Sequence, residues 1–236
     1  MGYLRLTSDK GYAAIMLSGG RDSLLAAALA VEDGYHIVPV ICDNGHMEGV
    51  ARAEWAVHNL QSVYDSNMVG NLVVRKTGYA LLQYMQSLWE MRAKALATRF
   101  PEVRMYQAHC LACKTTMYVS ILKFCHKCSI STLVDGVRRC QGFIVDYDET
   151  VGRFRKLCER EGVALLTPVF ELASDQVRKR MLNDRGLPTK TLEPQCFLGC
   201  PLVGELAQEE VDGLLELFDK EFIPLVELDL EKNVKL

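Results

Sequence analysis

The stretch that decides the fold is Ser18-Gly19-Gly20-Arg21-Asp22-Ser23, near the start of the chain. It follows an apolar run, 13–17, that predicts a strand, and it precedes a segment, 24–31, that predicts a helix. Glycines let the backbone approach an anion closely, and the free N–H groups at a helix start attract that anion. The serine hydroxyls add donors, and Asp22 can hold a Mg²⁺ ion that bridges phosphates. Because the lysine of a Walker loop is missing, the stretch predicts a phosphate-binding loop of another kind.

Length and composition limit the fold class and the cellular compartment that we expect for the chain. With 236 residues, of which 49% are hydrophobic, the chain suits one α/β domain with a modest appendage. No stretch reaches the ~18 uncharged apolar residues of a membrane span, and residues 1–10 lack the apolar segment of a secretory signal. We therefore expect a cytoplasmic protein without membrane contact. In that compartment the nine cysteines indicate metal or redox chemistry rather than disulfides.

The net charge of −3 is unevenly distributed. Residues 205–236 hold ten acidic and three basic side chains, so residues 1–204 carry 24 bases against 20 acids, or +4. We expect 1–204 to be the catalytic domain and 205–236 an acidic helix–strand appendage packed on it. The charge argues against a broad nucleic-acid footprint without excluding an RNA substrate.

Strand and helix signals alternate along the chain. Strands are predicted at 13–17, 36–42, 71–75, 130–134, 163–167 and 223–228, and helices at 22–31, 48–64, 79–98, 114–126, 147–161, 175–184 and 208–220. This alternation predicts βαβ units and a parallel sheet. Ligands of such sheets gather at the carboxyl ends of the strands, where the six-residue loop, Asp43 and the Asp135-Gly136 turn all fall.

At all six positions Ser18–Ser23 resembles the S-G-G-x-D-S loop of the PP-loop ATP pyrophosphatases. Asp135-Gly136-Val137 resembles the D-G-T turn of that family, and 166–188 resembles its P-L … K-x-x-V-R … G-L-P run. The resemblance covers residues 12–204 and implies a Rossmann-like, HUP-type α/β fold, in which helices flank a parallel sheet. It also implies that ATP is cleaved between its α and β phosphates, that a carbonyl or amide oxygen is adenylated, and that sulfur or ammonia then replaces AMP.

The resemblance further implies which residues serve the nucleotide. The phosphates would lie on Ser18–Ser23, with Asp22 as a catalytic residue that holds Mg²⁺. Asp135 and Gly136 would lie beside the α-phosphate, and the backbone of Ile41 and Cys42 would hold the adenine.

Arg138 and Arg139 follow the Asp135-Gly136 turn, where one of them could meet a phosphate, a surface role being the alternative.

Cys110 and Cys113 form a C-x-x-C pair immediately before the helix predicted at 114–126. Two thiolates at this spacing can bind one metal, and a helix N-terminus would lower their pKa. Lys114, the next residue, would also favour the thiolate forms.

One candidate for the other half of the metal site is Cys125 with Cys128, which would make a zinc ribbon. A helix over the twelve residues from Cys113 to Cys125 is ~18 Å long, whereas sulfurs on one metal lie ~4 Å apart. A zinc ribbon therefore requires that this helix be absent.

The other candidate is Cys196 with Cys200, in a Pro/Gly-rich loop. The arrangement resembles tRNA 2-thiocytidine synthetase, in which a C-x-x-C pair and one later cysteine bind a [4Fe-4S] cluster. Cys196-Phe-Leu-Gly also resembles the catalytic C-F-I-G of bacterial tRNA 2-thiouridylase. We expect Cys110, Cys113 and Cys196, or Cys200 in its place, to hold a cluster, or Cys196 to carry the sulfur. Four cysteine ligands would instead indicate structural zinc, and buried packing cysteines are the remaining alternative.

These observations predict an ATP-dependent sulfur transferase that adenylates a carbonyl oxygen and replaces it with sulfur. The acceptor would be a nucleobase, a tRNA or a small metabolite, and the sulfur would come from sulfide or a cysteine desulfurase. We expect a homodimer. Two alternatives stay open: an ATP-dependent amide or nitrogen-inserting ligase with structural zinc, and a nucleotide-binding redox or metal sensor.

Overall fold

Five parallel strands form one sheet in the order β3-β2-β1-β4-β5. The computed structural model describes residues 10–45, 49–91, 105–139, 142–172, 174–190 and 205–231. The strands are β1 (Tyr12–Met16), β2 (His36–Asp43), β3 (Val73–Lys76), β4 (Thr132–Val134) and β5 (Ala164–Leu166). The chain builds outward from β1 to β3 and then returns to add β4 on the other side of β1. This places the topological switch point, where such sheets bind ligands, between β1 and β4.

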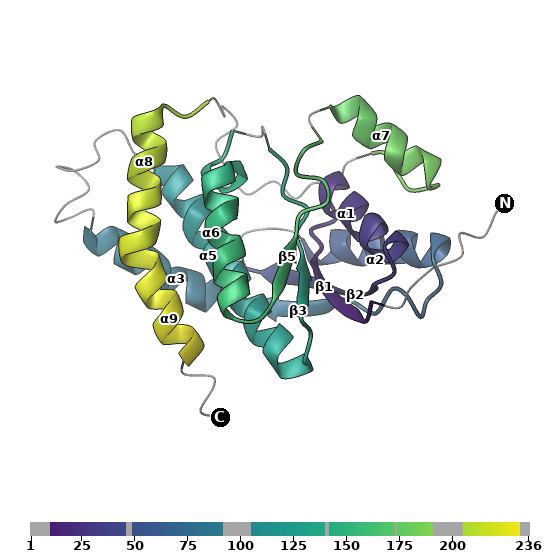
Figure 1. Cartoon of the computed structure of the whole chain (residues 1–236), viewed down its shortest axis with the longest axis horizontal. Helices are drawn as coiled ribbons and strands as arrows, with labels where there is room; N and C mark the ends of the chain where they lie inside the picture. The colour runs from purple at the N-terminus through teal and green to yellow at the C-terminus, as the bar shows by residue number, and fades with distance from the viewer. Residues whose placement is uncertain are drawn as a thin grey trace.

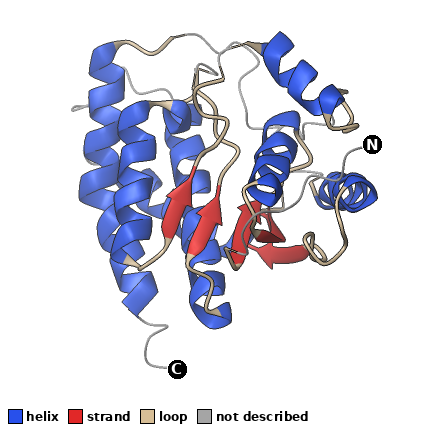
Figure 2. Cartoon of the chain, turned by 45° about the vertical axis from the view of Figure 1, so that its right-hand side comes forward, coloured by secondary structure: helices blue, strands red, loops and turns tan. Residues whose placement is uncertain are grey.

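Helices cover both faces of the sheet (Figures 1 and 2). They are α1 (Arg21–Glu32), α2 (Val50–Val63), α3 (Gly78–Met91), α5 (Met105–Cys128), α6 (Asp148–Arg160), α7 (Asp175–Asp184), α8 (Gln208–Leu217) and α9 (Ile223–Glu231), with the short turns η2 (Ile144–Asp146) and η3 (Phe218–Phe222). Core residues of α1, α2 and α7 form one hydrophobic cluster, and those of α3, α5, α6, α8, η3 and α9 form another. Within the described residues, no helix has the length and apolar character needed to cross a membrane.

The central strand β1 is buried from both sides. Ala14 and Met16 pack into the cluster that contains α5, whereas Ala13 and Ile15 pack into the cluster that contains α1. Successive side chains of a strand point to opposite faces. A strand covered on both faces must therefore be apolar at every position, which is why β1 is visible in the sequence as a continuous apolar run.

Aromatic rings connect the helices of the larger cluster. Tyr118 of α5 stacks on Phe154 of α6 with 4.2 Å between ring centroids, and Phe154 meets Phe218 of η3 edge-on at 5.4 Å. Phe222 lies edge-on to Tyr84 of α3 at 5.7 Å. Such pairs contribute ~0.5–1.5 kcal/mol each beyond their burial. The C-terminal helices thus share the hydrophobic core that supports the sheet.

The segment 223–228, predicted as a strand, is helical and begins α9. Helices α8, η3 and α9 follow one another without a loop, and Pro224, which cannot donate a helical hydrogen bond, follows the wider π-turn of η3. Val226 and Leu230 are both buried in the cluster that contains α5. Their spacing of four residues is that of one helix face, and it outweighs the strand-like composition of the segment.

Candidate nucleotide-binding site

The six-residue loop lies at the carboxyl end of β1 and leads directly into α1. Gly19 has a φ of +85°, and a Cβ at this position would come within 2.7 Å of the backbone of Arg52 in α2. Both the backbone conformation and the close approach therefore require glycine. Gly20 is the N-cap of α1, so the helix begins without a side-chain cap. This is the arrangement in which a helix N-terminus binds an anion.

Two serines hold the loop in one shape. The hydroxyl oxygens of Ser18 and Ser23 lie 3.1 Å apart, and the Ser18 N–H donates to Ser23 Oγ at 3.2 Å. Ser23 Oγ donates to the carbonyl of Gly20 at 3.0 Å, and the Gly20 N–H donates to Ser18 Oγ at 3.2 Å. Because these bonds fix the loop, binding a ligand costs little ordering entropy.

The turn after β4 packs directly on the start of α1. A Cβ at Gly136 would lie 2.6 Å from both the Cα and the N of Ser23. No larger residue fits there without moving the helix. The loop after β1 and the turn after β4 thus form one continuous surface at the switch point of the sheet.

Asp135, the first residue of that turn, is held by two side chains of α5. Lys114 Nζ lies 2.8 Å from one carboxylate oxygen, and the hydroxyl of Tyr118 donates to the same oxygen at 2.7 Å. Burial and the Asp135 charge raise the pKa of Tyr118 well above its usual value, so it remains a donor. Lys114 was expected to favour the cysteine thiolates, and the structure pairs it with Asp135 instead.

Asp22, in the first turn of α1, lies among arginines. It is ion-paired with Arg178 of α7, and the Nε of Arg138 lies 3.5 Å from the same carboxylate oxygen. Arg178 also pairs with Asp175, which accepts a hydrogen bond from Arg21 at 3.3 Å. Three guanidinium groups therefore surround two carboxylates beside the loop.

A buried carboxyl group, that of Asp146 in η2, lies near these charges. It is 7% exposed, and its Oδ2 has no hydrogen-bond partner. Burial raises the pKa of Asp146 to about 7, with the positive charge of Lys114 opposing that shift. Gln107 fixes the preceding turn, because it donates to the carbonyl of Gly142 at 3.0 Å and accepts from the N–H of Ile144 at 2.8 Å.

The end of β2 lies beside one of the predicted metal ligands. Ile41 and Cys42 are both 6% exposed. The Cys42 Sγ lies 4.0 Å from the carbonyl oxygen of Met117 in α5, and burial raises the pKa of Cys42 to about 12. Its thiol is thus a packing group, which leaves its backbone for the role that the resemblance implies. Asn44 donates to the Sγ of Cys113 at 3.3 Å, so the carboxyl end of β2 contacts the C-x-x-C pair.

Cys110 and Cys113 lie inside α5 rather than before it, because this helix begins at Met105. Both are partly exposed, and their spacing of three residues places them on one helix face. The predicted effect of a helix N-terminus on them is wrong, since that effect is confined to the first turn. The sequence 105–113 contains no glycine, proline or capping residue that would have delayed the helix.

The continuous helix also excludes the zinc ribbon. Cys113 and Cys125 are twelve residues apart in α5, or ~18 Å. Burial raises the pKa of Cys125 to about 12, as expected of a packing cysteine. Cys196 and Cys200 lie outside the described residues. Among the residues that are described, no group of three or more His, Cys, Asp or Glu side chains could hold a metal ion.

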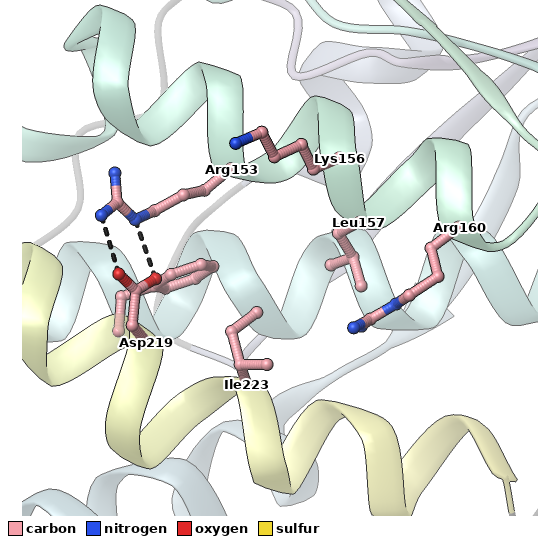
Figure 3. Close-up of a pocket in the computed structure, with 7 residues that line it drawn as sticks. Arg153, Lys156, Leu157, Arg160, Asp219 and Ile223 are labelled. Atoms are coloured by element: carbon pink, nitrogen blue, oxygen red, sulfur yellow. Dashed lines mark hydrogen bonds and ion pairs between the residues drawn. The ribbon is translucent and has the colours of Figure 1, made fainter.

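A surface hollow of about 200 Å³ lies between α6 and the η3–α9 segment (Figure 3). Arg153, Lys156 and Arg160 line it from α6. Arg153 donates to both carboxylate oxygens of Asp219 at 2.8 and 2.7 Å, and Arg160 lies 2.7 Å from Glu227. Two of its three basic groups are thus neutralised, and none of its residues belongs to the cluster around Asp22.

Four side chains of the site were not predicted from the sequence: Tyr118, Asp146, Asp175 and Arg178. Arg178 lies in the run that resembles K-x-x-V-R, so this resemblance could have indicated it. No sequence pattern predicts a functional role for Tyr118 or Asp146, because the burial of an isolated polar side chain cannot be inferred from its sequence neighbours.

Comparison with protein-family models and with curated protein sequences found no match. Among solved structures, a 4-thiouridine synthetase in complex with RNA and ATP matches with a TM-score of 0.60 and 14% identity, covering 94% of this chain and 53% of that one. NMN synthetase from Francisella tularensis matches with a TM-score of 0.53 and 13% identity, covering 96% of this chain and 85% of that one. This chain spans about half the length of the thiouridine synthetase.

These likenesses, together with the parallel sheet and its strand order, show the fold. The chain has the α/β fold of the PP-loop ATP pyrophosphatases, as the sequence predicts.

Proposed function

We propose that this protein is an ATP-dependent sulfur transferase, which adenylates a carbonyl oxygen of its acceptor and replaces that oxygen with sulfur. The observation that carries the proposal is the close packing of the loop. Gly19 and Gly136 are both positions where a Cβ would overlap backbone atoms, and both lie beside the start of α1. These contacts fix the start of α1, which has no side-chain cap, and a helix N-terminus of this kind is suited to a phosphate chain.

The residues of the loop take distinct parts in the adenylation. Ser18, Gly20 and Ser23 bind the phosphates, and Asp22 offers the carboxylate oxygen that Mg²⁺ prefers. The acceptor oxygen attacks the α-phosphorus as the bond to the β-phosphate breaks, and pyrophosphate leaves with the electron pair. Fixed N–H groups around the leaving oxygens stabilise this developing charge.

The cysteines support sulfur as the second nucleophile. Cys110 and Cys113 share an accessible face of α5, and Cys113 contacts the carboxyl end of β2, on the same edge of the sheet as the loop. With Cys196 or Cys200 they would hold a [4Fe-4S] cluster that supplies bound sulfide; alternatively, Cys196 would carry a persulfide. The fold of a 4-thiouridine synthetase bound to RNA favours a nucleobase in RNA as the acceptor.

Anaerobic purification followed by iron, sulfide and zinc analysis tests the cysteine site. The assay supplies ATP, Mg²⁺, sulfide and candidate acceptors, and measures AMP together with a mass increase of 16 Da, the difference between sulfur and oxygen. We expect Cys110→Ser and Cys113→Ser to lose the iron and the mass increase. Cys128→Ser, an exposed cysteine at the far end of the same helix, is the matched control. One equivalent of zinc without iron would contradict the cluster.

A nitrogen-inserting ligase is the second candidate, favoured by the fold likeness to NMN synthetase. Release of AMP that depends on ammonia, in the absence of any sulfur source, would support this ligase over the transferase. Tight ATP binding without AMP release across all acceptors would instead support a nucleotide sensor.

A further inference from the structure

The side chain of Asn44 connects the sheet to the C-x-x-C pair. Asn44 directly follows β2, and its amide Nδ2 donates to the Sγ of Cys113 in α5 at 3.3 Å. The two residues are 69 positions apart in the chain, so the fold alone brings them together. Asn44 is 6% exposed, whereas Cys113 is partly exposed. A buried amide thus donates to a sulfur that remains accessible.

The backbone at Asn44 is fixed by the segment that leads from β3 into α3. The N–H of Thr77 donates to the carbonyl oxygen of Asp43, the preceding residue, at 2.8 Å. A Cβ at Gly78 would lie 3.0 Å from the carbonyl oxygen of Asn44, so the start of α3 packs closely on this residue. Because its backbone is already held, Asn44 can keep its amide on Cys113 without further ordering of the chain.

An amide N–H favours the anionic form of a sulfur over the thiol, since hydrogen bonds to ionised groups are roughly twice as strong as neutral ones. The thiolates of the C-x-x-C pair were expected to be stabilised by Lys114 and by a helix N-terminus. Lys114 Nζ instead donates to Asp135 at 3.0 Å, and Cys113 lies well inside α5. Asn44 supplies, as a neutral donor, a contact to the sulfur that neither of these provides.

We infer that Asn44 is a positioning residue for Cys113: its amide N–H orients the sulfur and stabilises the anionic form that a metal ligand requires. The inference rests on the proposed function, in which Cys113 binds a metal as a thiolate. Partners of metal ligands influence metal affinity, and hydrogen bonds to ligand sulfurs influence the reduction potential. Asn44 donates a hydrogen bond and transfers no proton.

Titration of the reduced, metal-free full chain with Co²⁺ alone tests the inference, because thiolate ligands give Co²⁺ a charge-transfer absorption. We expect Asn44→Leu, which has a similar size and no donor, to weaken Co²⁺ binding by about 10–100-fold, the usual effect of losing the partner of a metal ligand. Asn44→Gln, which keeps an amide on a longer arm, should recover part of the lost affinity.

The matched control is Asn59→Leu, which should leave Co²⁺ binding unchanged. Asn59 also donates through its amide, but to the carbonyl of Trp55 within α2. ATP-dependent thermal stabilisation should be the same in the Asn44 variants as in wild type, because the amide of Asn44 contacts Cys113. If Asn44→Leu does not fold, as judged by circular dichroism, Asn44→Ala carries the test.

The reduction potential of the iron-containing protein gives a second measurement, which a merely structural role would not move. A hydrogen bond to a ligand sulfur stabilises the more negative, reduced state. Asn44→Leu should therefore have a lower potential than wild type, and Asn44→Gln should lie between them.

Three outcomes separate the inference from the proposed function. Unchanged Co²⁺ affinity and potential in Asn44→Leu, with a wild type that forms AMP and the sulfur-containing product, would overturn the inference alone. Co²⁺ binding that depends on Asn44 and Cys113, in a protein that transfers no sulfur to any acceptor, would support the inference and overturn the sulfur transferase. A wild type that binds neither Co²⁺ nor iron through Cys110 and Cys113 would overturn both the inference and the cluster.

Discussion

Two arginine–aspartate pairs in this molecule look alike in chemistry and differ in setting. Arg178 and Asp22, beside the loop, have side chains 4% and 10% exposed, whereas Arg153 of α6 and Asp219 of η3 are 29% and 48% exposed. The exposed pair is complete in itself, since Arg153 donates through both Nε and a terminal nitrogen. The buried pair leaves the Nε of Arg178 without a partner. The hydrogen bonds of Arg153 to Asp219 are thus more complete than those of the buried pair, which lies where we propose that the protein binds a nucleotide.

The largest expected effect on stability and activity is that of replacing a glycine beside the loop. Gly136→Ala would place a Cβ 2.6 Å from the backbone of Ser23. We expect it to lower the free energy of unfolding by ~3 kcal/mol and AMP formation by ~100-fold, because the start of α1 must move. Denaturant unfolding and an AMP assay measure the two effects.

The matched control is Gly152→Ala in α6, where an added Cβ meets nothing within 4 Å. This change should stabilise the protein by ~0.5–1 kcal/mol, since alanine favours a helix, and leave AMP formation unchanged. Equal effects of the two substitutions would contradict the difference between the regions.

The next largest effect is expected at the buried carboxyl group of Asp146, which makes the free energy of unfolding depend on pH. Burial raises its pKa from 3.8 to about 7, so between these values the folded protein binds more protons than the unfolded chain. Stability contributed by this group is therefore lost as pH rises through that range. Asp146→Asn removes the ionisable group, and we expect it to raise the free energy of unfolding by ~2 kcal/mol at pH 8, with a smaller gain at pH 5.

Unfolding curves at several pH values measure this difference. Asp184→Asn, which changes an exposed carboxylate at the end of α7, should show no such pH dependence. A destabilised Asp146→Asn protein at pH 8 would show that the ionised form of Asp146 is needed in the fold.

The smallest effect is expected at the exposed pair. Arg153→Gln should cost less than ~1 kcal/mol, because exposed ion pairs gain little over their hydration. It should also leave nucleotide binding unaltered, which thermal unfolding with and without ATP can check. A loss of several kcal/mol would mean that the C-terminal helices depend on this pair rather than on their aromatic packing.

The sequence was sufficient for the fold because the decisive features are local. The loop, the apolar β1 and the alternation of strands and helices can each be recognised within about a dozen residues. Two sequence predictions were wrong because tertiary packing decides the local structure there. The segment 223–228 has the composition of a strand but the burial pattern of a helix, and α5 begins before the C-x-x-C pair rather than after it. Asp22 and Arg178, which are in contact, are 156 residues apart in the sequence, and no local sequence pattern predicts their contact.

The unbroken length of α5 has a consequence for how an acceptor must behave. Cys113 and Lys114 are neighbours on this helix; Asn44 is bonded to the first and Asp135 to the second. Further along, Lys123 is held at 2.7 Å by Asp229 of α9. A helix held by these three contacts cannot slide toward the nucleotide without breaking them. In the sulfur transferase proposed above, the acceptor would therefore have to move between the nucleotide and Cys110 or Cys113, because α5 holds these two cysteines in place.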